Sequence, residues 1–201
     1  MRVRRIHRSA MRKAVYFAML LGLLIAVSVR AADADLDRLM ALLAARAHGH
    51  VSFVEEDDLA VLNRPVRSSG ELFYDRPDRL EKRTLAPHPA SIILEHGSIT
   101  IQSHGREHVL ALRDYPQVAP FVESLRATLA GDRQALEQVF QVTFAGTLER
   151  WTLTLVPSDA KLKSVAQLIH IDGERDELKS VSITMADGDR SIMTIGSSLP
   201  P

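Results

Sequence analysis

The sequence contains no cysteine among its 201 residues. This excludes disulfide bonds, zinc or iron–sulfur sites ligated by cysteine, thiol catalysis and a lipid-modified N-terminal cysteine. Only one asparagine occurs, Asn63, and it precedes Arg64 and Pro65, so the chain offers no N-x-[ST] glycosylation site.

Sequence motifs of several large enzyme classes are also missing. The chain has no G-x-S-x-G, G-x-x-x-x-G-K-[ST], G-x-G-x-x-G or H-E-x-x-H. The acidic run 55–58 lacks the spacing of a calcium loop, and a solvated strand edge is the simpler interpretation. Metal binding by the pairs His48/His50 and His104/His108 stays open beside the interpretation that these are surface or turn histidines. We expect no enzyme activity, no cofactor and no metal.

Positive charge is concentrated at the N-terminus. The chain has 25 basic and 25 acidic residues, but residues 1–31 hold seven of the basic residues and no acidic one. Residues 32–201 therefore hold 18 basic and 25 acidic residues, a net charge of −7. Such a body lacks the basic surface that nucleic-acid binding requires, so we expect no nucleic-acid partner.

The first 31 residues have the order of a secretory signal peptide. A basic stretch, 2–13, precedes 16 uncharged residues, 14–29, and a cluster of small residues around Ala31. The apolar run is shorter than the about 20 residues of a bilayer span, and an uncleaved signal anchor is the alternative. We predict a signal peptide over 1–31 and a single domain over 32–201 that functions in the periplasm.

The body begins with a helix and continues with strands. Apolar residues at helical spacing predict an amphipathic helix over 35–47. From His50 onward apolar residues alternate, which predicts a long strand that extends to Leu59 and Val61. Short alternating runs separated by proline and glycine predict further strands of an antiparallel meander at 66–74, 79–85, 91–95, 98–103 and 107–112.

Two helices are predicted to interrupt the strands. Phe121, Leu125 and Leu129 share one apolar helical face, and the helix is expected to end at Gly131. Asp132 is placed to cap a second, shorter helix. These helices lie between two groups of strands in the sequence.

The final strands are separated by turns. Asp172-Gly173 and Asp187-Gly188 are both typical of hairpin turns, and residues 158–163 suggest a helical turn. The strands are predicted at 142–145, 151–156, 166–171, 178–185 and 191–195. About eleven strands with helices at the front and in the middle indicate a mainly β, α+β fold. A curved antiparallel sheet covered loosely by helices on one side leaves an apolar pocket.

The order of these elements resembles a known family, the periplasmic outer-membrane lipoprotein carriers or LolA-like proteins. The most specific stretch is 70–80 (GELFYDRPDRL), where a glycine and an alternating strand lead to the pair Arg76-Pro77. The resemblance covers residues 35–195. Further matches lie at 50–56 (HVSFVEE), at 92–97 (IILEHG) and at Pro120-Phe121, which looks like the start of the family's lid helix.

The resemblance implies an open, incomplete β-barrel of about eleven antiparallel strands, with lid helices over an apolar cavity. It implies a monomeric carrier that accepts the acyl chains of a lipoprotein, or of a related acyl lipid, from an inner-membrane donor complex. The carrier then delivers them to an outer-membrane acceptor. Each methylene exposed to water costs about 0.8 kcal/mol, so such cargo needs a shield.

The resemblance also singles out Arg76. In the family this arginine faces the cavity mouth and hydrogen-bonds the backbone of the lid. Here Arg76 shares strand parity with Leu72 and Tyr74, so the three side chains are expected to point the same way. The alternative is an arginine that ends a strand in solvent.

The other candidate lining residues are apolar. The residues of the lid helix could either line the cavity or pack in the core as the apolar face of an ordinary amphipathic helix. Parity cannot decide whether the residues at 151–155 line the cavity or pack behind the sheet. The candidates are Phe53, Ile92 and Leu94, the lid residues Phe121, Leu125 and Leu129, and Trp151, Leu153 and Leu155.

Two further functions remain open at this stage. A protein of the same fold could be an envelope sensor or interaction module that binds lipid or protein without transport. A further hypothesis is an enzyme acting on lipid or glycan. It would need a pair of catalytic carboxylates in the pocket, and the sequence reveals no such pair. Within the carrier hypothesis, isoleucines at 99 and 101 replace an expected aromatic residue, which leaves a glycolipid or another acyl lipid as alternative cargo.

Overall fold

The structure is a computed structural model that describes residues 33–116 and 119–198. The predicted signal peptide over 1–31 lies outside the described residues and stays a prediction. None of the helices in the described part of the chain is long and apolar enough to cross a membrane.

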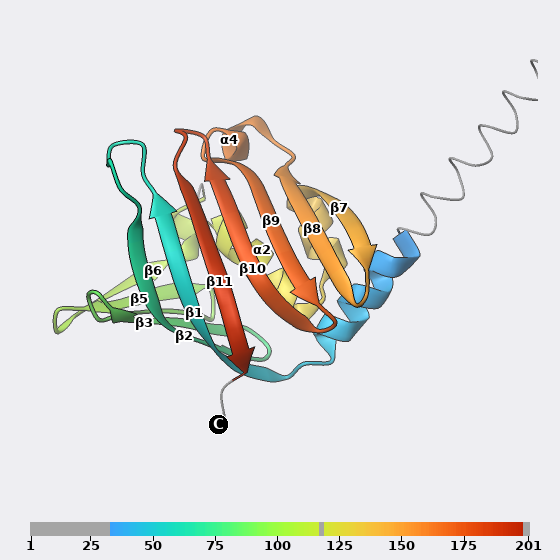
Figure 1. Cartoon of the computed structure of the whole chain (residues 1–201), viewed down its shortest axis with the longest axis horizontal. Coiled ribbons are helices and arrows are strands. Elements are labelled where there is room, and N and C mark those ends of the chain that lie inside the picture. The colour runs from blue at the N-terminus through green and yellow to red at the C-terminus, as the bar shows by residue number, and fades with distance from the viewer. Residues whose placement is uncertain (1–32, 117–118, 199–201) are drawn as a thin grey trace, which may run out of the picture.

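Eleven antiparallel strands form one strongly curved sheet (Figure 1). Its order is β6-β5-β4-β3-β2-β1-β11-β10-β9-β8-β7, so the first strand pairs with the last, and β6 and β7 are the two edges. The strands are β1 His48–Asp58, β2 Val66–Asp75, β3 Arg79–Ala86, β4 Ala90–Glu95, β5 Ser98–Ser103, β6 Arg106–Ala111, β7 Phe140–Thr147, β8 Arg150–Pro157, β9 Ala166–Glu174, β10 Glu177–Met185 and β11 Arg190–Ser198. The predicted open, mainly β architecture is confirmed.

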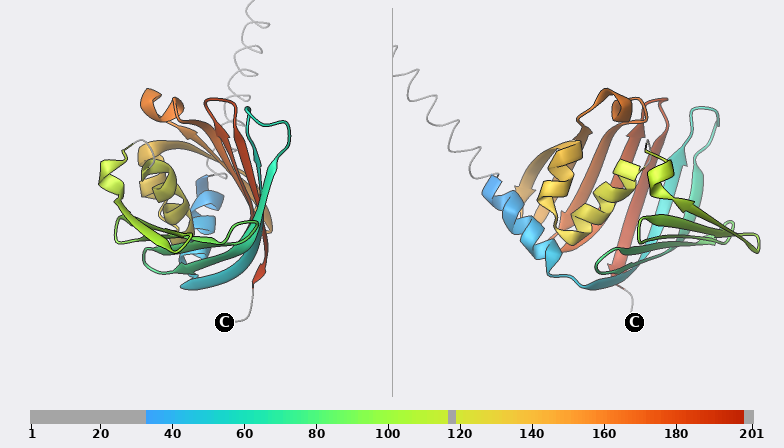
Figure 2. Two further views of the ribbon diagram at one scale, coloured as in Figure 1. Left: turned by 90° about the vertical axis from the view of Figure 1, so that its left-hand side faces the viewer. Right: turned by 180° about the vertical axis from the view of Figure 1, so that it is seen from behind.

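The N-terminal helix and the two α-helices between β6 and β7 cover the concave side of this sheet (Figure 2). The N-terminal helix, residues 33–44, precedes β1. A short 3-10 helix, Leu112–Asp114, then α2, Ala119–Ala130, and α3, Arg133–Val139, together connect β6 to β7. Because β6 and β7 are opposite edges of the open sheet, this connection must cross its open side. The last helix is the single turn α4, Ala160–Lys163.

The junction of α2 and α3 is fixed by local backbone chemistry. Gly131 adopts φ +67°, the left-handed conformation that commonly follows a helix, and a Cβ there would overlap the backbone at Met40 and Ala44 of the N-terminal helix. The Asp132 side chain accepts a hydrogen bond of 3.0 Å from the backbone N–H of Ala135, as predicted for a cap. The C-terminal end of α2 therefore sits directly against the last turn of the N-terminal helix.

The hydrophobic core fills only one half of the concave face. Four buried residues of the N-terminal helix at the spacing i, i+3, i+4, i+7 face β8 and β9, and α3 closes the same cluster. This half of the barrel is therefore filled by packed side chains. The other half, formed by β1–β3, β10 and β11 and called the hollow half below, is covered by α2. The core residues include Leu36, Leu39, Met40, Leu43, Leu136, Phe140, Ile169 and Ile171.

Two predicted boundaries were wrong near the first strand. The strand does not reach Leu59 and Val61: β1 ends at Asp58, and Val61 lies in the following turn with 89% of its surface exposed. The first helix ends at residue 44 rather than 47, because the chain must turn before β1 begins pairing with β2 at His48.

One predicted turn was also wrong. Asp172 and Gly173 lie inside β9, and the chain turns at Arg175 and Asp176, where Arg175 takes φ +53°. Gly173 is needed within the strand because the ring of Trp151 packs where its side chain would stand. The predicted turn at Asp187-Gly188 is confirmed.

Candidate functional site

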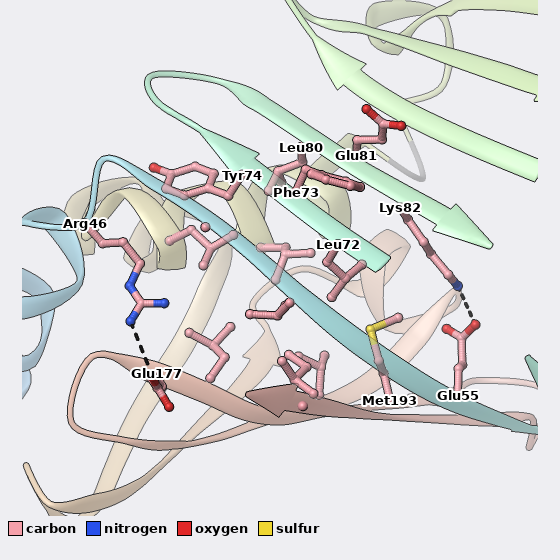
Figure 3. Close-up of a pocket in the computed structure, with 18 of the residues that line it drawn as sticks. Arg46, Glu55, Leu72, Phe73, Tyr74, Leu80, Glu81, Lys82, Glu177 and Met193 are labelled. Carbon is pink, nitrogen blue, oxygen red and sulfur yellow. Dashed lines mark hydrogen bonds and ion pairs between the residues drawn. The ribbon is translucent and has the colours of Figure 1, made fainter. Parts of the chain in front are cut away.

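A cavity of about 230 Å³ lies between α2 and the hollow half of the sheet (Figure 3). It is bounded by β1, β2 and β3 on one side and by β10 and β11 on the other. Its lining is predominantly apolar, and α2 covers it with two leucines, Leu125 and Leu129. The sheet contributes Leu72, Val181, Ile183, Met193 and Ile195 among others.

A salt bridge borders one end of the cavity. Lys82 on β3 reaches across β2 and donates its ammonium hydrogen to Glu55 on β1 (Figure 3). Glu55 also accepts hydrogen bonds from Ser68, at 3.1 Å, and Ser191, at 3.4 Å. The ammonium stands 5.2 Å from the ring centre of Phe53, within the range of a cation–π contact. Both charges are thus satisfied although they border an apolar space.

A second group of charges borders the opposite end. The Arg46 guanidinium donates to Asp176 at 2.7 Å and lies 4.0 Å from Glu177, both in or next to the β9–β10 turn (Figure 3). The hydrogen bond from Arg46 holds the pKa of Asp176 below its usual value, against the effect of burial. This ion pair ties the segment before β1 to the far wall of the cavity.

Tyr74 lies at the same end of the cavity as Arg46 (Figure 3). Its side chain is 5% exposed, and its hydroxyl has no hydrogen-bond partner within the described residues. Burial raises the pKa of Tyr74, while the charges of Arg76 and Arg126 lower it in part. The phenol therefore remains protonated at neutral pH. Its O–H group is a hydrogen-bond donor without a partner in the described part of the chain, on a side chain that lines the apolar cavity.

Arg76, the residue after β2, links the sheet to the N-terminal helix. Its side chain donates a hydrogen bond to the carbonyl oxygen of Ala44 in the last turn of that helix. Its backbone N–H donates to the carbonyl oxygen of Ala47 at 2.9 Å. The last carbonyl groups of a helix lack partners within it and attract cations, so this is a favourable position for arginine. The helix that Arg76 contacts is the N-terminal one, whereas the family resemblance implied a hydrogen bond to the backbone of the lid helix over 121–129.

Four of the predicted residues line the cavity together: Leu72 and Tyr74 from β2, and Leu125 and Leu129 from α2. Phe53 is buried at the cavity's end, beneath Lys82.

The remaining predicted residues lie elsewhere. Ile92 and Leu94 share the face of Leu80 through strand pairing but are not part of the lining; Leu94 is buried and Ile92 is 42% exposed. The side chain of Phe121 lies outside the described residues.

The three predicted residues of β8 belong to the core instead. Trp151, Leu153 and Leu155 are fully buried beneath the N-terminal helix and α3 and are not part of the cavity lining. The Trp151 indole N–H donates to the carbonyl oxygen of Arg175 at 2.8 Å, which satisfies its one polar group.

Sequence reasoning missed both charged ends of the cavity. Glu55 appeared only within the acidic run 55–58, Lys82 was not singled out, and Arg46 and Asp176 lie 130 residues apart in the sequence. Strand parity could have placed Lys82 on the same face of β3 as Leu80. Its pairing with Glu55 could be predicted only if the register of β1, β2 and β3 were known as well.

No group of three or more His, Asp or Glu side chains comes together as a metal site in residues 33–116 and 119–198.

The sequence matches the family described as outer membrane lipoprotein carrier protein LolA-like over residues 26–198. No curated protein matches it. Among solved structures it is similar to a LolA superfamily protein from Nitrosomonas europaea, with 11% identity, a TM-score of 0.43 and coverage of 84% of this chain and 94% of that one. It is also similar to LprF from Mycobacterium bovis, with 10% identity, a TM-score of 0.35 and coverage of 83% and 93%.

A further similarity is to the MucA/MucB complex of Pseudomonas aeruginosa, with 12% identity, a TM-score of 0.45 and coverage of 83% of this chain and 59% of that one. At these identities and TM-scores, the solved structures add nothing to the assignment that the family match provides.

Proposed function

Because the chain belongs to the outer membrane lipoprotein carrier protein LolA-like family, we propose that it is a periplasmic carrier of acyl chains. Its cargo is a lipoprotein or a related acyl lipid, which it accepts from an inner-membrane donor and delivers to an outer-membrane acceptor. The single observation that supports this most strongly is the apolar cavity between α2 and the sheet. The proposed role is binding and transport and includes no catalysis.

The shape of the cavity suits a reversible shield. Its lining is apolar, so an acyl chain inside it avoids the cost of about 0.8 kcal/mol for each methylene exposed to water. At about 230 Å³ it lies below the about 300–1,000 Å³ of typical ligand pockets. Loading with a long chain therefore requires α2 to move outward, which makes α2 the lid.

Arg76 supplies a latch for this movement. Its bond to Ala44 holds the end of the N-terminal helix, and the end of α2 rests on that same turn through Gly131. A single hydrogen bond between an exposed arginine and a carbonyl contributes only about 1 kcal/mol, so the closed form is favoured but opens readily. Such a latch lets the carrier exchange cargo instead of retaining it.

The proposal is tested by native mass spectrometry of the full chain expressed in a Gram-negative periplasm. A carrier is expected to retain a lipid or lipoprotein that denaturing extraction releases, and the added mass identifies it. A protein that carries no lipid, and that also takes up no added acyl lipid, would contradict the proposal. That outcome would favour an envelope interaction module that binds a protein partner without transport.

A further inference from the structure

Tyr74 is the one lining side chain in the described part of the chain whose buried polar atom lacks a hydrogen-bond partner. It is 95% buried, and its hydroxyl finds no hydrogen-bond partner there. A buried donor without a partner costs free energy, so natural proteins rarely keep one without a reason. The other polar lining residues named above, Lys82 with Glu55 and Arg46 with Asp176, already satisfy one another.

We propose that the Tyr74 hydroxyl anchors the head of the cargo chain by donating a hydrogen bond to an acyl oxygen, the carbonyl of an ester or amide or the carboxylate of a fatty acid. This inference rests on the proposed carrier function and names the group that the cavity recognises. The chain itself then extends along the apolar lining, away from the end that holds Tyr74 and Arg46.

The space for such a head group lies beside Tyr74. Its cross-strand neighbour on β1 is Gly49, which also lines the cavity, and a Cβ atom added at Gly49 would meet nothing within 4 Å. The neighbour on the other side is Leu80, an apolar lining residue. The two strands that flank Tyr74 therefore place an open space at Gly49 on one side of it and an apolar leucine on the other.

The charges around this end favour an oxygen acceptor. The guanidinium groups of Arg76 and Arg126 both act on Tyr74, and Arg46 lies at the same end. Arg126 is paired with Glu123 and Arg46 with Asp176, whereas Arg76 forms no ion pair within residues 33–116 and 119–198. One unneutralised positive charge near a protonated phenol attracts a carbonyl dipole and, more strongly, a carboxylate.

The test compares three probes of equal chain length: dodecanoate, methyl dodecanoate and dodecane. Each displaces the fluorescent probe N-phenyl-1-naphthylamine from the wild-type protein, from Tyr74→Phe and from Tyr115→Phe, a tyrosine outside the cavity lining as the matched control. We expect Tyr74→Phe to weaken both oxygen-bearing probes about five- to tenfold and to leave dodecane unchanged. If Tyr74→Phe loses more affinity for dodecanoate than for methyl dodecanoate, the natural group is a carboxylate. If it loses the same affinity for these two probes and none for dodecane, the group is an ester or amide carbonyl.

Thermal unfolding of the same variants supplies a second readout. Removing an unpaired hydroxyl should leave the melting temperature of Tyr74→Phe equal to or above that of the wild type, whereas a structural hydroxyl would lower it. Gly49→Val, which fills the open room without changing the hydroxyl, should weaken the oxygen-bearing probes more than dodecane.

Three results would overturn the inference. These are a lower melting temperature of Tyr74→Phe, equal losses for all three probes, or no loss for any of them. If no acyl probe displaced the fluorophore from the wild type, the carrier function would fall as well. If all probes bound equally well to the wild type and Tyr74→Phe, only the role of Tyr74 would fall.

Discussion

The Arg76 guanidinium donates a hydrogen bond to the carbonyl oxygen of Ala44, although 32 residues separate them. Ala44 lies in the last turn of the N-terminal helix, and the same turn leaves no room for a side chain at Gly131, where α2 ends. The rim of the sheet, the N-terminal helix and the end of α2 thus meet at Ala44. A change at Arg76 should therefore affect opening of the cavity without altering its lining.

Replacing Arg76 with alanine should speed cargo entry. Without the hydrogen bond to Ala44, the N-terminal helix and α2 are held less firmly, and the free energy of unfolding should fall by about 1 kcal/mol. Stopped-flow uptake of N-phenyl-1-naphthylamine should become several-fold faster. Arg67→Ala is the matched control, because Arg67 is an exposed arginine on β2 that pairs with Glu56. Equal uptake rates in the two variants would remove the latch from the mechanism.

Replacing both lid leucines with serine should abolish tight binding of acyl chains. Leu125 and Leu129 are the apolar cover that α2 provides, and burial of one such side chain is worth about 1.5–3 kcal/mol. The dissociation constant for dodecanoate should rise at least tenfold in the displacement assay. Leu42→Ser, at a leucine 37% exposed on the N-terminal helix, should bind as the wild type does. An unchanged affinity in the double variant would place the binding site elsewhere.

Replacing Gly173 with alanine should destabilise the core strongly. A methyl group at this position overlaps the Trp151 ring, and forcing atoms into a packed core costs about 1–3 kcal/mol. Trp151 is the only tryptophan of the chain, so its fluorescence reports the unfolding transition in urea directly. Gly49→Ala is the control, because its methyl group meets nothing within 4 Å. The packing account fails if both variants unfold at the wild-type urea concentration.

The stability of the protein should fall in acid partly through Glu81. Burial alone raises the pKa of this carboxyl, but the hydrogen bonds and charges of Arg83, Ser91 and Arg79 outweigh it and lower the pKa. A group whose pKa is lower in the folded state stabilises the fold above its unfolded pKa, about 4.3 for glutamate. This contribution is lost as the pH falls through the lower folded pKa.

Urea unfolding between pH 7 and pH 3 tests this assignment. Glu81→Gln should lose less stability than the wild type over that interval, because the variant lacks the carboxylate at position 81 that the wild type must protonate. Glu107→Gln, an exposed glutamate on β6, should follow the wild-type curve. Parallel curves for the wild type and Glu81→Gln would show that the Glu81 cluster does not contribute to acid sensitivity.

Local patterns predicted the number and nature of the elements well. Alternating apolar residues bounded by proline and glycine located the strands, and the helical spacing of Leu125 and Leu129 located α2. Both patterns depend only on neighbours in the sequence. The pattern failed at Gly173, where a good turn sequence lies inside a strand because Trp151, on a neighbouring strand, needs its space. Tertiary packing there overrides local turn preference.

The cavity itself depends on pairings that local patterns do not contain. Its two walls come together because β1 pairs with β11, which places Val54 opposite Thr194, 140 residues further along the chain. Alternation in β8 and β10 looks alike, yet Leu153 on β8 is packed in the core, whereas Val181 and Ile183 on β10 line the cavity. The motif around Arg76 predicted a contact with a helix, but only the packing identifies the helix that ends at Ala44.

The central claim, carriage of acyl chains across water, is tested most directly by transfer between vesicles. Donor vesicles contain a quenched fluorescent acyl lipid, acceptor vesicles contain none, and the protein is added between them. We predict a transfer rate that rises in proportion to protein concentration and falls to the spontaneous rate with Leu125→Ser/Leu129→Ser. A folded wild-type protein that leaves the spontaneous rate unchanged at every concentration would contradict the account.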